Sequence, residues 1–252
     1  METKLNGVVI TSSPGPTPKT FKDKWRPAVA ELTAIACLAF VYLLNSFYSK
    51  EEWYLDHGIS YQLGILLSGP PGTGKTSLAK AISSEYKKDL YILSPSSLHH
   101  IDSALSSIPE KSILLIEDID TNYATNKRSQ IKRNDKNEED KELFSFTNLS
   151  DVLNAIDGIV VSHGRVLIAT TNHQNKLDPA LIREGRFDIK ILIDYADSYI
   201  LKQFFDRYYP NYKIDNNFKI KNEISSAKIQ SLILKNLDNP QEVLKELTYY
   251  EN

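Results

Sequence analysis

The chain has a single cysteine, Cys37, and five histidines among its 252 residues, and it has no large excess of one charge. One cysteine allows neither an intramolecular disulfide nor a cysteine-based metal site, which favours a reducing compartment. The five histidines show no spacing that would set two of them on one helix face with a carboxylate, so no histidine metal site is expected. A formal net charge of -2 gives no overall field that would attract nucleic acid.

The overall composition is that of an ordinary globular protein. Hydrophobic residues make up 41% of it and charged residues 25%. At this length the chain can bury one substantial core, or one large domain with a small companion, and two large independent domains would not fit.

The first fifty residues divide into two segments. Residues 1–27 are predicted to be flexible, because 11–20 contain three prolines and a glycine. Residues 28–49 are predicted to be an apolar helix, because 32–48 carry no charge and lie at the lower limit of length for a membrane span. Basic residues precede this run and acidic residues follow it, so a span would place the rest of the chain outside the cytoplasm. We therefore favour an edge helix or a subunit contact, with a membrane anchor as the alternative.

Residues 50–195 have the pattern of an α/β domain, in which apolar strands alternate with helices around a parallel sheet. A highly charged stretch at 122–142 is predicted to be a solvated loop, and apolar spacing predicts a helix at 149–158. Residues 196–252 are predicted to be a small helical lid with helices near 200–208, 226–235 and 240–247. The predicted strands are 63–67, 90–93, 113–116, 166–170 and 189–193.

A phosphate-binding loop follows the first of these strands. The motif G-x-x-x-x-G-K-[ST] lies between an apolar strand and a helix, the context in which its backbone N–H groups surround a polyphosphate. Lys75 is expected to meet the outer phosphates of ATP, and the Thr76 hydroxyl to bind Mg²⁺. The predicted nucleotide-binding residues are Gly69, Pro70, Pro71, Gly72, Thr73, Gly74, Lys75, Thr76 and Ser77.

Carboxylates and an amide follow two later strands. Glu117 and Asp118 end the strand at 113–116, and consecutive strand residues point to opposite sides. We assign Glu117 to the metal, through a water, and Asp118 to the attacking water. Asn172 ends the strand at 166–170 and is a candidate for holding the same water or the γ-phosphate. These residues also have simpler interpretations: Glu117 and Asp118 as solvent-facing acids at a strand end, and Asn172 as a turn residue.

These motifs together resemble the AAA subset of the AAA+ ATPases. The resemblance rests on Gly-Pro-Pro-Gly-Thr-Gly-Lys-Thr at 69–76, Thr-Thr-Asn at 170–172 and Leu-Asp-Pro-Ala-Leu-Ile-Arg-Glu-Gly-Arg-Phe-Asp at 177–188. It implies that Arg183 and Arg186 reach into the nucleotide site of a neighbouring subunit, in a ring commonly of six or seven members. Taken alone, these arginines could be surface charges.

A narrower resemblance covers residues 50–250. The segments Glu-Glu-Trp-Tyr-Leu-Asp-His-Gly-Ile at 51–59, Glu-Asp-Ile-Asp at 117–120 and Ile-Ser-Ser-Ala-Lys-Ile-Gln at 224–230 are similar to the mitochondrial translocase family that inserts the folded Rieske protein into respiratory complex III. That family has a transmembrane helix and a middle domain before the motor, where this chain has some fifty residues. The segment 94–108 has no aromatic residue and no glycine, which disfavours threading of an unfolded client.

The function expected from these features is that of an ATP-hydrolysing homo-oligomeric ring in protein remodelling, translocation or complex assembly. One alternative is a nucleic-acid-associated ATPase or loader, supported only by basic residues in 122–142 that are interleaved with acids. Another is a nucleotide-dependent assembly switch with little turnover. A protein client is expected and nucleic acid is not, in a reducing compartment that contains ATP, either the cytoplasm or the matrix side of mitochondria.

Overall fold

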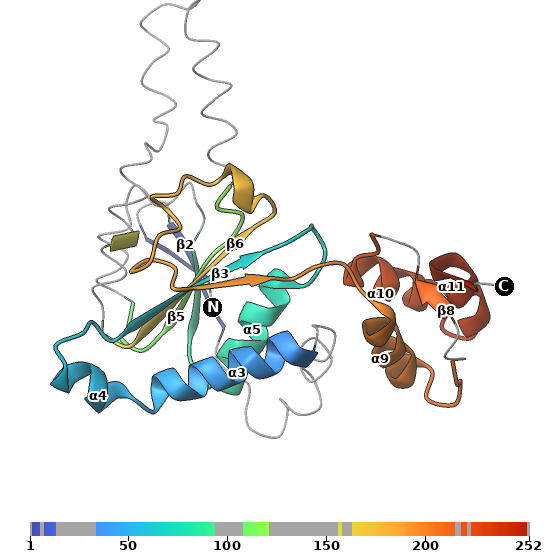
Figure 1. The fold of residues 1–252 in the computed structure, drawn as a ribbon, viewed down its shortest axis with the longest axis horizontal. Coiled ribbons are helices and arrows are strands. Elements are labelled where there is room, and N and C mark those ends of the chain that lie inside the picture. The colour runs from blue at the N-terminus through green and yellow to red at the C-terminus, as the bar shows by residue number, and fades with distance from the viewer. Residues whose placement is uncertain are drawn as a thin grey trace, which may run out of the picture. The chain divides into compact units, whose positions relative to one another are not determined.

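Figure 1 shows the fold of the chain in a computed structural model, with the secondary-structure elements labelled. The structure describes residues 2–5, 8–13, 34–93, 108–120, 156–157, 163–214, 218–220 and 223–250. The predicted charged loop at 122–142, and all of the predicted helix at 149–158 except Ile156 and Asp157, lie outside these ranges. The described residues fall into two compact units, one built around a sheet and one that contains the C-terminal helices.

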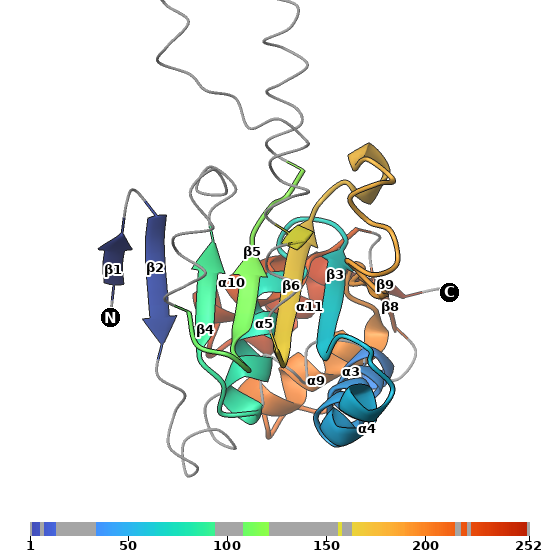
Figure 2. The ribbon, with the colours of Figure 1, turned by 90° about the vertical axis from the view of Figure 1, so that its left-hand side faces the viewer.

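The sheet of the first unit has seven strands in the order β1-β2-β4-β5-β6-β3-β7. Figure 2 shows this order from left to right, beginning with β1 and β2 and continuing through β4, β5 and β6 to β3. The four strands β4, β5, β6 and β3 are parallel. Every residue of β5 and β6 is buried, as expected for central strands covered on both faces. The predicted α/β class with a parallel sheet is therefore confirmed. The strand bounds are β1 Glu2–Leu5, β2 Val8–Ser13, β3 Gln62–Ser68, β4 Leu90–Leu93, β5 Ile113–Ile116, β6 Arg165–Thr171 and β7 Ile189–Leu192.

Residues 2–5 and 8–13, which belong to the segment expected to be flexible, form strands. β1 and β2 pair with each other, and β2 adds antiparallel to β4 with Thr11 opposite Ile92. The reason is the free edge of β4, whose backbone N–H and C=O groups would otherwise lack strand partners. Local composition gives no signal for such an added edge.

The core of the first unit lies around this sheet. Its largest fully buried side chain is Phe187, which follows the last turn before β7. The other buried members are apolar side chains from the strands and the segments between them, namely Leu66, Leu93, Ile108, Leu114, Ile116, Ile119, Ile156, Leu167, Ala169, Leu177 and Leu181.

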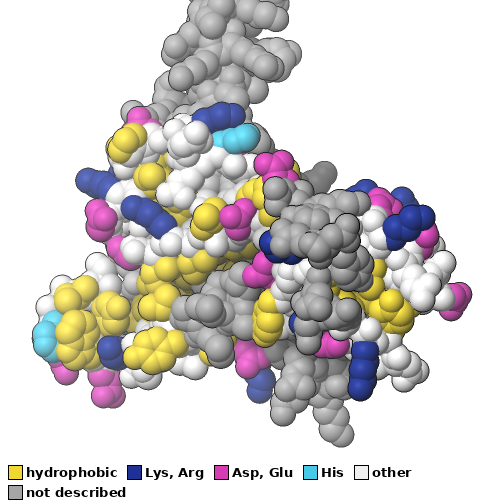
Figure 3. All heavy atoms as spheres, turned by 45° about the vertical axis from the view of Figure 1, so that its right-hand side comes forward, with side chains coloured by type: hydrophobic (Ala, Val, Ile, Leu, Met, Phe, Trp, Pro, Cys, Tyr) yellow, Lys and Arg dark blue, Asp and Glu magenta, His cyan; other side chains and the backbone are white. Residues whose placement is uncertain are grey.

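Two helices, α3 (Ala34–Tyr48) and α4 (Glu51–Asp56), lie between β2 and β3 in the chain. Near the end of α3, Phe47 is buried and its ring stacks on Tyr61 with centroids 4.5 Å apart. Hydrophobic side chains gather at the surface over α4 (Figure 3), where Trp53, Leu55 and Ile59 are exposed. Within the part of the chain that the structure describes, no helix has both the length and the apolar character needed to cross a bilayer.

An ionic cluster attaches the start of α4 to the sheet. The Glu51 carboxylate lies 2.7 Å from Lys111 Nζ, which precedes β5, and 2.9 Å from His163 Nε2, which precedes β6. The hydrogen bonds from Lys111 and then from His163 hold the pKa of the Glu51 carboxyl below its usual value. The contact is therefore fully formed above the ordinary pKa of a glutamate and is lost as the pH falls through the lowered value.

Glu51→Gln is expected to remove this acid-dependent part of the stability. The melting temperature of the wild type should exceed that of the variant near neutral pH, and the difference should vanish as the pH is lowered from about 6 to about 3. Thermal melts at a series of pH values measure it. Glu52→Gln, at an exposed position on the same helix, is the control; equal pH profiles for all three proteins would contradict the assignment.

The second unit contains three C-terminal helices, α9 (Ser198–Tyr208), α10 (Ser226–Lys235) and α11 (Pro240–Leu247), with the strands β8 (Phe218–Ile220) and β9 (Thr248–Tyr250) paired antiparallel. Each helix begins at a side-chain cap: Asp197, Ser225 and Asn239 accept hydrogen bonds from backbone N–H groups of the first turn.

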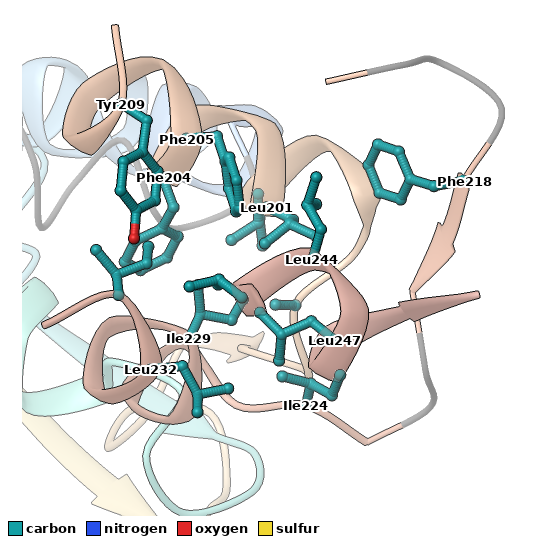
Figure 4. Close-up of a cluster of buried hydrophobic side chains, with 14 residues drawn as sticks. Leu201, Phe204, Phe205, Tyr209, Phe218, Ile224, Ile229, Leu232, Leu244 and Leu247 are labelled. Atoms are coloured by element: carbon teal, nitrogen blue, oxygen red, sulfur yellow. The ribbon is translucent and has the colours of Figure 1, made fainter. Parts of the chain in front are cut away.

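The three helices share a core of their own, shown in Figure 4. Phe204 and Phe205 from α9 lie in one cluster with Ile229 from α10 and Leu244 from α11, and all four are nearly or fully buried. The apolar spacing that predicted each helix is thus the spacing of the side chains that meet here.

Candidate nucleotide site

The predicted phosphate loop begins directly after β3. Pro71 and Gly72 are exposed, whereas Thr73 and Lys75 are buried. Gly72 adopts a φ of +77°, a conformation that other residues rarely accept. The loop ends where α5 (Lys75–Glu85) begins, so the first N–H groups of that helix follow the turn. Such an arrangement suits an anion, because these N–H groups have no partner within the helix.

Lys75 is folded into the loop. Its side chain is 7% exposed, and Nζ donates hydrogen bonds of 2.7 Å to the carbonyl oxygens of Gly69 and of Pro70. The Thr73 hydroxyl donates to the Pro70 carbonyl at 2.9 Å. These bonds hold an ammonium group inside the turn, where a phosphate would meet a positive charge that needs little further ordering.

The loop belongs to the second unit and is bonded there to α10. The backbone N–H of Ala227, in the first turn of α10, donates to the Gly72 carbonyl at 3.0 Å. A Cβ atom placed on Gly72 would lie 3.2 Å from Ser225 Oγ and 3.2 Å from Ala227 Cβ. The tip of the phosphate loop therefore lies directly against the start of α10.

In the first unit, the carboxyl ends of β5 and β6 bring the predicted acid and amide together. Asn172 Nδ2 donates to Asp118 Oδ1 at 3.2 Å, and the backbone N–H of Asp118 donates to Thr170 Oγ1 at 3.0 Å. Asp118 has a φ of +47°, a strained conformation for a non-glycine residue that these bonds help to hold. Glu117, half-buried, lies between β5 and Asp118.

Asp120 is a functional candidate that the sequence analysis missed. It is buried, and its Oδ1 accepts hydrogen bonds from Thr171 Oγ1 at 2.9 Å and from the Asn172 backbone N–H at 3.2 Å. Asp120 therefore fixes the main chain that carries the Asn172 amide. Asp120 belongs to the Glu-Asp-Ile-Asp segment that carries the narrower resemblance, but its position two residues after Asp118 does not by itself distinguish it from a solvent-facing acid.

Asp120→Ala is expected to lower the free energy of unfolding by about 1–3 kcal/mol, because the fully buried Thr171 hydroxyl loses its acceptor. Urea unfolding measures the change. The control is Asp56→Ala at an exposed position on α4, which should stay within about 0.5 kcal/mol of the wild type. Equal stability of the two variants would show that the Asp120 contacts contribute nothing.

The two predicted arginines lie in different surroundings. Arg183 is exposed, whereas the Arg186 guanidinium is buried and forms a bidentate ion pair with Asp157, with both N···O distances 2.7 Å. The remaining guanidinium nitrogen of Arg186, Nη1, donates to the Ala180 carbonyl oxygen. The hydrogen bonds from Arg186 hold the pKa of the Asp157 carboxyl below its usual range. The structure therefore pairs Arg186 within its own chain, which the sequence analysis did not foresee.

The donor set around the loop fits Mg-ATP. A buried ammonium among loop carbonyls, and the N–H groups at the start of a helix, can donate hydrogen bonds to phosphate oxygens. Thr76, half-buried in the first turn of α5, carries the hydroxyl expected on Mg²⁺, and Ser77 beside it is exposed. The Thr76 hydroxyl is a hard oxygen ligand of the kind that Mg²⁺ takes, and the Lys75 ammonium supplies the positive charge that phosphate requires.

A family model agrees with the fold. Residues 65–195 match the ATPase family associated with various cellular activities (AAA), a range that contains the phosphate loop, the acidic strand end and both arginines. The chain therefore belongs to the AAA family of ATPases.

Several relatives narrow the comparison. The chain is 38% identical over 215 residues to the probable mitochondrial chaperone BCS1-A of Dictyostelium discoideum, which covers 81% of this chain and 50% of that protein. It is 35% identical over 208 residues to the human mitochondrial chaperone BCS1, covering 78% and 48%, and 32% identical over 212 residues to the probable mitochondrial chaperone bcs1 of Schizosaccharomyces pombe, covering 80% and 44%. The resemblance to AAA ATPases and to this mitochondrial subfamily is confirmed. The chain spans about half the length of these relatives.

Proposed function

We propose that this chain is an ATP-hydrolysing motor that works as a ring of like subunits on a protein client, in remodelling, translocation or complex assembly. The observation that carries the proposal is the buried Lys75 ammonium, held by two carbonyl oxygens inside a turn that leads into a helix. A buried positive charge in such a turn is favourable when an anion occupies it, and the outer phosphates of ATP supply that anion.

The residues divide the reaction between them. The sequence motifs assign the phosphates to the main chain of 72–77 and to Lys75, and they assign Mg²⁺ to Thr76 and, through a water, to Glu117. When bound, Mg²⁺ neutralises charge on the phosphate oxygens. Asp118 orients the water that attacks the γ-phosphorus as the bond to the β-phosphate oxygen breaks. Its carboxylate is itself held by the Asn172 amide at 3.2 Å.

The ring is part of the proposal because an arginine from the 177–188 segment would complete the site of a neighbouring subunit. Positive charge placed near the transferred phosphoryl group offsets the charge that develops there, and such arginines change rates by about 10³ to 10⁵ in general. A role on protein clients is supported by the names of the three relatives described above, each of which is called a mitochondrial chaperone or a probable one.

Steady-state phosphate release, measured together with particle mass with and without ATP, tests the proposal. We expect Mg-ATP to produce a larger particle that releases phosphate at a rate independent of added DNA. The mass is also measured in detergent and in its absence, which separates assembly through the motor from attachment to lipid.

Each alternative predicts a different result. Strong stimulation by DNA would favour the nucleic-acid-associated ATPase, and assembly on ATP with negligible phosphate release would favour the assembly switch. Failure to bind Mg-ATP at all, at protein concentrations that allow assembly, would refute all three.

A further inference from the structure

Two consecutive threonines end β6, and each has a buried hydroxyl. The side chains of Thr170 and Thr171 point to opposite sides of the strand, because successive strand residues alternate. Thr170 is 1% exposed and Thr171 is fully buried. Valine would fill the same space, whereas threonine adds a hydroxyl that must find a hydrogen-bond partner when it is buried. The two partners differ, and they lie on different sides of the candidate site.

The segment that follows β5 departs from the register of β5 and β6. Ile116 lies opposite Ala169, and the Ile119 N–H donates to the Thr170 carbonyl at 2.9 Å. Between these two attachments the segment advances from residue 116 to 119, while β6 advances only from 169 to 170. The acidic pair between the attachments therefore loops out, as extra residues do in a β-bulge, a feature that often re-aims a side chain beside an active site.

Thr170 holds both peptide groups that flank Asp118. Its Oγ1 accepts a hydrogen bond of 3.0 Å from the Asp118 N–H, and its carbonyl accepts the bond from Ile119. The φ of Asp118 is +47°, in the left-handed region that few residues other than glycine, asparagine and aspartate adopt. Because the two flanking peptide groups define the φ and ψ of a residue, Thr170 holds Asp118 in this conformation.

The main chain of Asp118 in turn sets the direction of its Cβ atom and so the place of its carboxylate. Asn172 Nδ2 donates to Asp118 Oδ1 at 3.2 Å. The Asn172 main chain is itself held by Asp120, whose Oδ1 accepts from the Asn172 N–H and from the Thr171 hydroxyl. Thr171 thus serves the amide end of this contact, and Thr170 serves the carboxylate end.

We propose that Thr170 is a positioning residue for ATP hydrolysis: it holds the left-handed backbone of Asp118 and thereby places the carboxylate that orients the attacking water. This inference rests on the proposed function, in which Asp118 has that role. Aspartate is shorter than glutamate, so its carboxylate has less freedom to make up for a displaced backbone. The Thr170 hydroxyl should therefore affect the rate of hydrolysis and not the affinity for nucleotide, which depends on the phosphate loop.

Steady-state hydrolysis of Mg-ATP by the assembled full chain tests this role. Thr170→Val keeps the shape of the side chain but removes the acceptor, and we expect kcat to fall by about 10- to 100-fold through misplacement of Asp118. The affinity for a fluorescent ATP analogue should be unchanged. Thr170→Ser keeps the hydroxyl and loses only the methyl group, so it should retain most of the kcat. A role in packing alone predicts the reverse order of the two variants.

Ser112→Ala is the matched control for the loss of a buried hydroxyl. Ser112 is 3% exposed and its Oγ donates to the Pro109 carbonyl at 2.7 Å. It directly precedes β5, at the end of the strand opposite to the acids. Ser112→Ala should lower the melting temperature, as Thr170→Val does, without slowing hydrolysis. A fall of kcat in proportion to the melting temperature in both variants would overturn the positioning role.

The Asp118→Asn background shows whether the Thr170 hydroxyl acts through Asp118. Asp118→Asn alone should lose about 10²- to 10⁴-fold in kcat, because an amide cannot act as a base toward the attacking water. Adding Thr170→Val should cause no further loss, since the hydroxyl then has no carboxylate to place. Thr170→Ala removes the hydroxyl without adding a methyl group in its place. It should slow hydrolysis as Thr170→Val does, and it serves as the second variant if valine prevents folding.

The failure of this inference can be told apart from the failure of the proposed function. A wild type that does not release phosphate would overturn the proposed function, and the role of Thr170 with it. A wild type that hydrolyses ATP, together with Thr170→Val and Thr170→Ala variants of equal kcat, would overturn only the role of Thr170. Losses that multiply in the Asp118→Asn background would do the same.

Discussion

Lys75→Ala is expected to abolish measurable binding of Mg-ATP, with a loss of affinity of at least about 100-fold, or roughly 2.7 kcal/mol. The ammonium of Lys75 is the positive charge that the loop holds in place, and its two hydrogen bonds of 2.7 Å to loop carbonyls fix it there. Removing it takes away the charge that meets the phosphates and also a bond network that orders the turn. Titration with a fluorescent ATP analogue measures the affinity.

The matched control is Lys80→Ala, at an exposed position on the same helix. Each substitution removes one positive charge from α5, so an effect of net charge alone would lower the nucleotide affinity of both variants equally. We expect Lys80→Ala to bind nucleotide within about twofold of the wild type, because exposed charges are well screened by solvent and salt. Equal affinity of Lys75→Ala and the wild type would remove the basis of the nucleotide site.

Gly64→Ala is expected to be the most destabilising single-methyl change in the sheet, at about 3 kcal/mol. Gly64 lies in β3 opposite Leu167 of β6, and an added Cβ would collide with the carbonyl of Arg186. That carbonyl belongs to main chain leading into Phe187, which is fully buried and cannot move away without opening the core. Urea or thermal unfolding measures the loss of stability.

Gly58→Ala provides the comparison for this change. Gly58 has a φ of +63° but no atom within 4 Å of its would-be Cβ, so alanine there meets conformational strain without a collision. We expect it to cost about 1 kcal/mol. If both substitutions had the same effect, the close approach of Arg186 to β3 would not be a constraint on the fold.

Much of the fold was predictable because its signals are local. The strand at 113–116 is a short apolar run that ends in two acids, and the structure has β5 at Ile113–Ile116. The helices at 226–235 and 240–247 begin after Ser225 and Asn239, whose side chains cap them as such residues commonly do. The phosphate loop is likewise a contiguous motif that needs no distant partner to be recognised.

The rest depends on pairs that are far apart in the chain. Asp120 and Thr171 are 51 residues apart, and Asp157 and Arg186 are 29 apart. No local pattern relates the members of either pair, because only the folded chain brings them together. The burial of Arg186 was unpredictable for the same reason, and the pairing of β2 with β4 depends on an edge that exists only after the sheet has formed.

The link between Gly72 and α10 uses only main-chain atoms, a carbonyl and the N–H of Ala227 at 3.0 Å. Nineteen of the twenty amino acids would supply that N–H, so the identity of the side chain at 227 reveals nothing about this link. Proline alone lacks the donor, and Ala227→Pro would detach the tip of the loop from the helix while leaving every side chain of the loop in place. A main-chain hydrogen bond of this kind can therefore be kept when the residue at position 227 changes to any amino acid except proline.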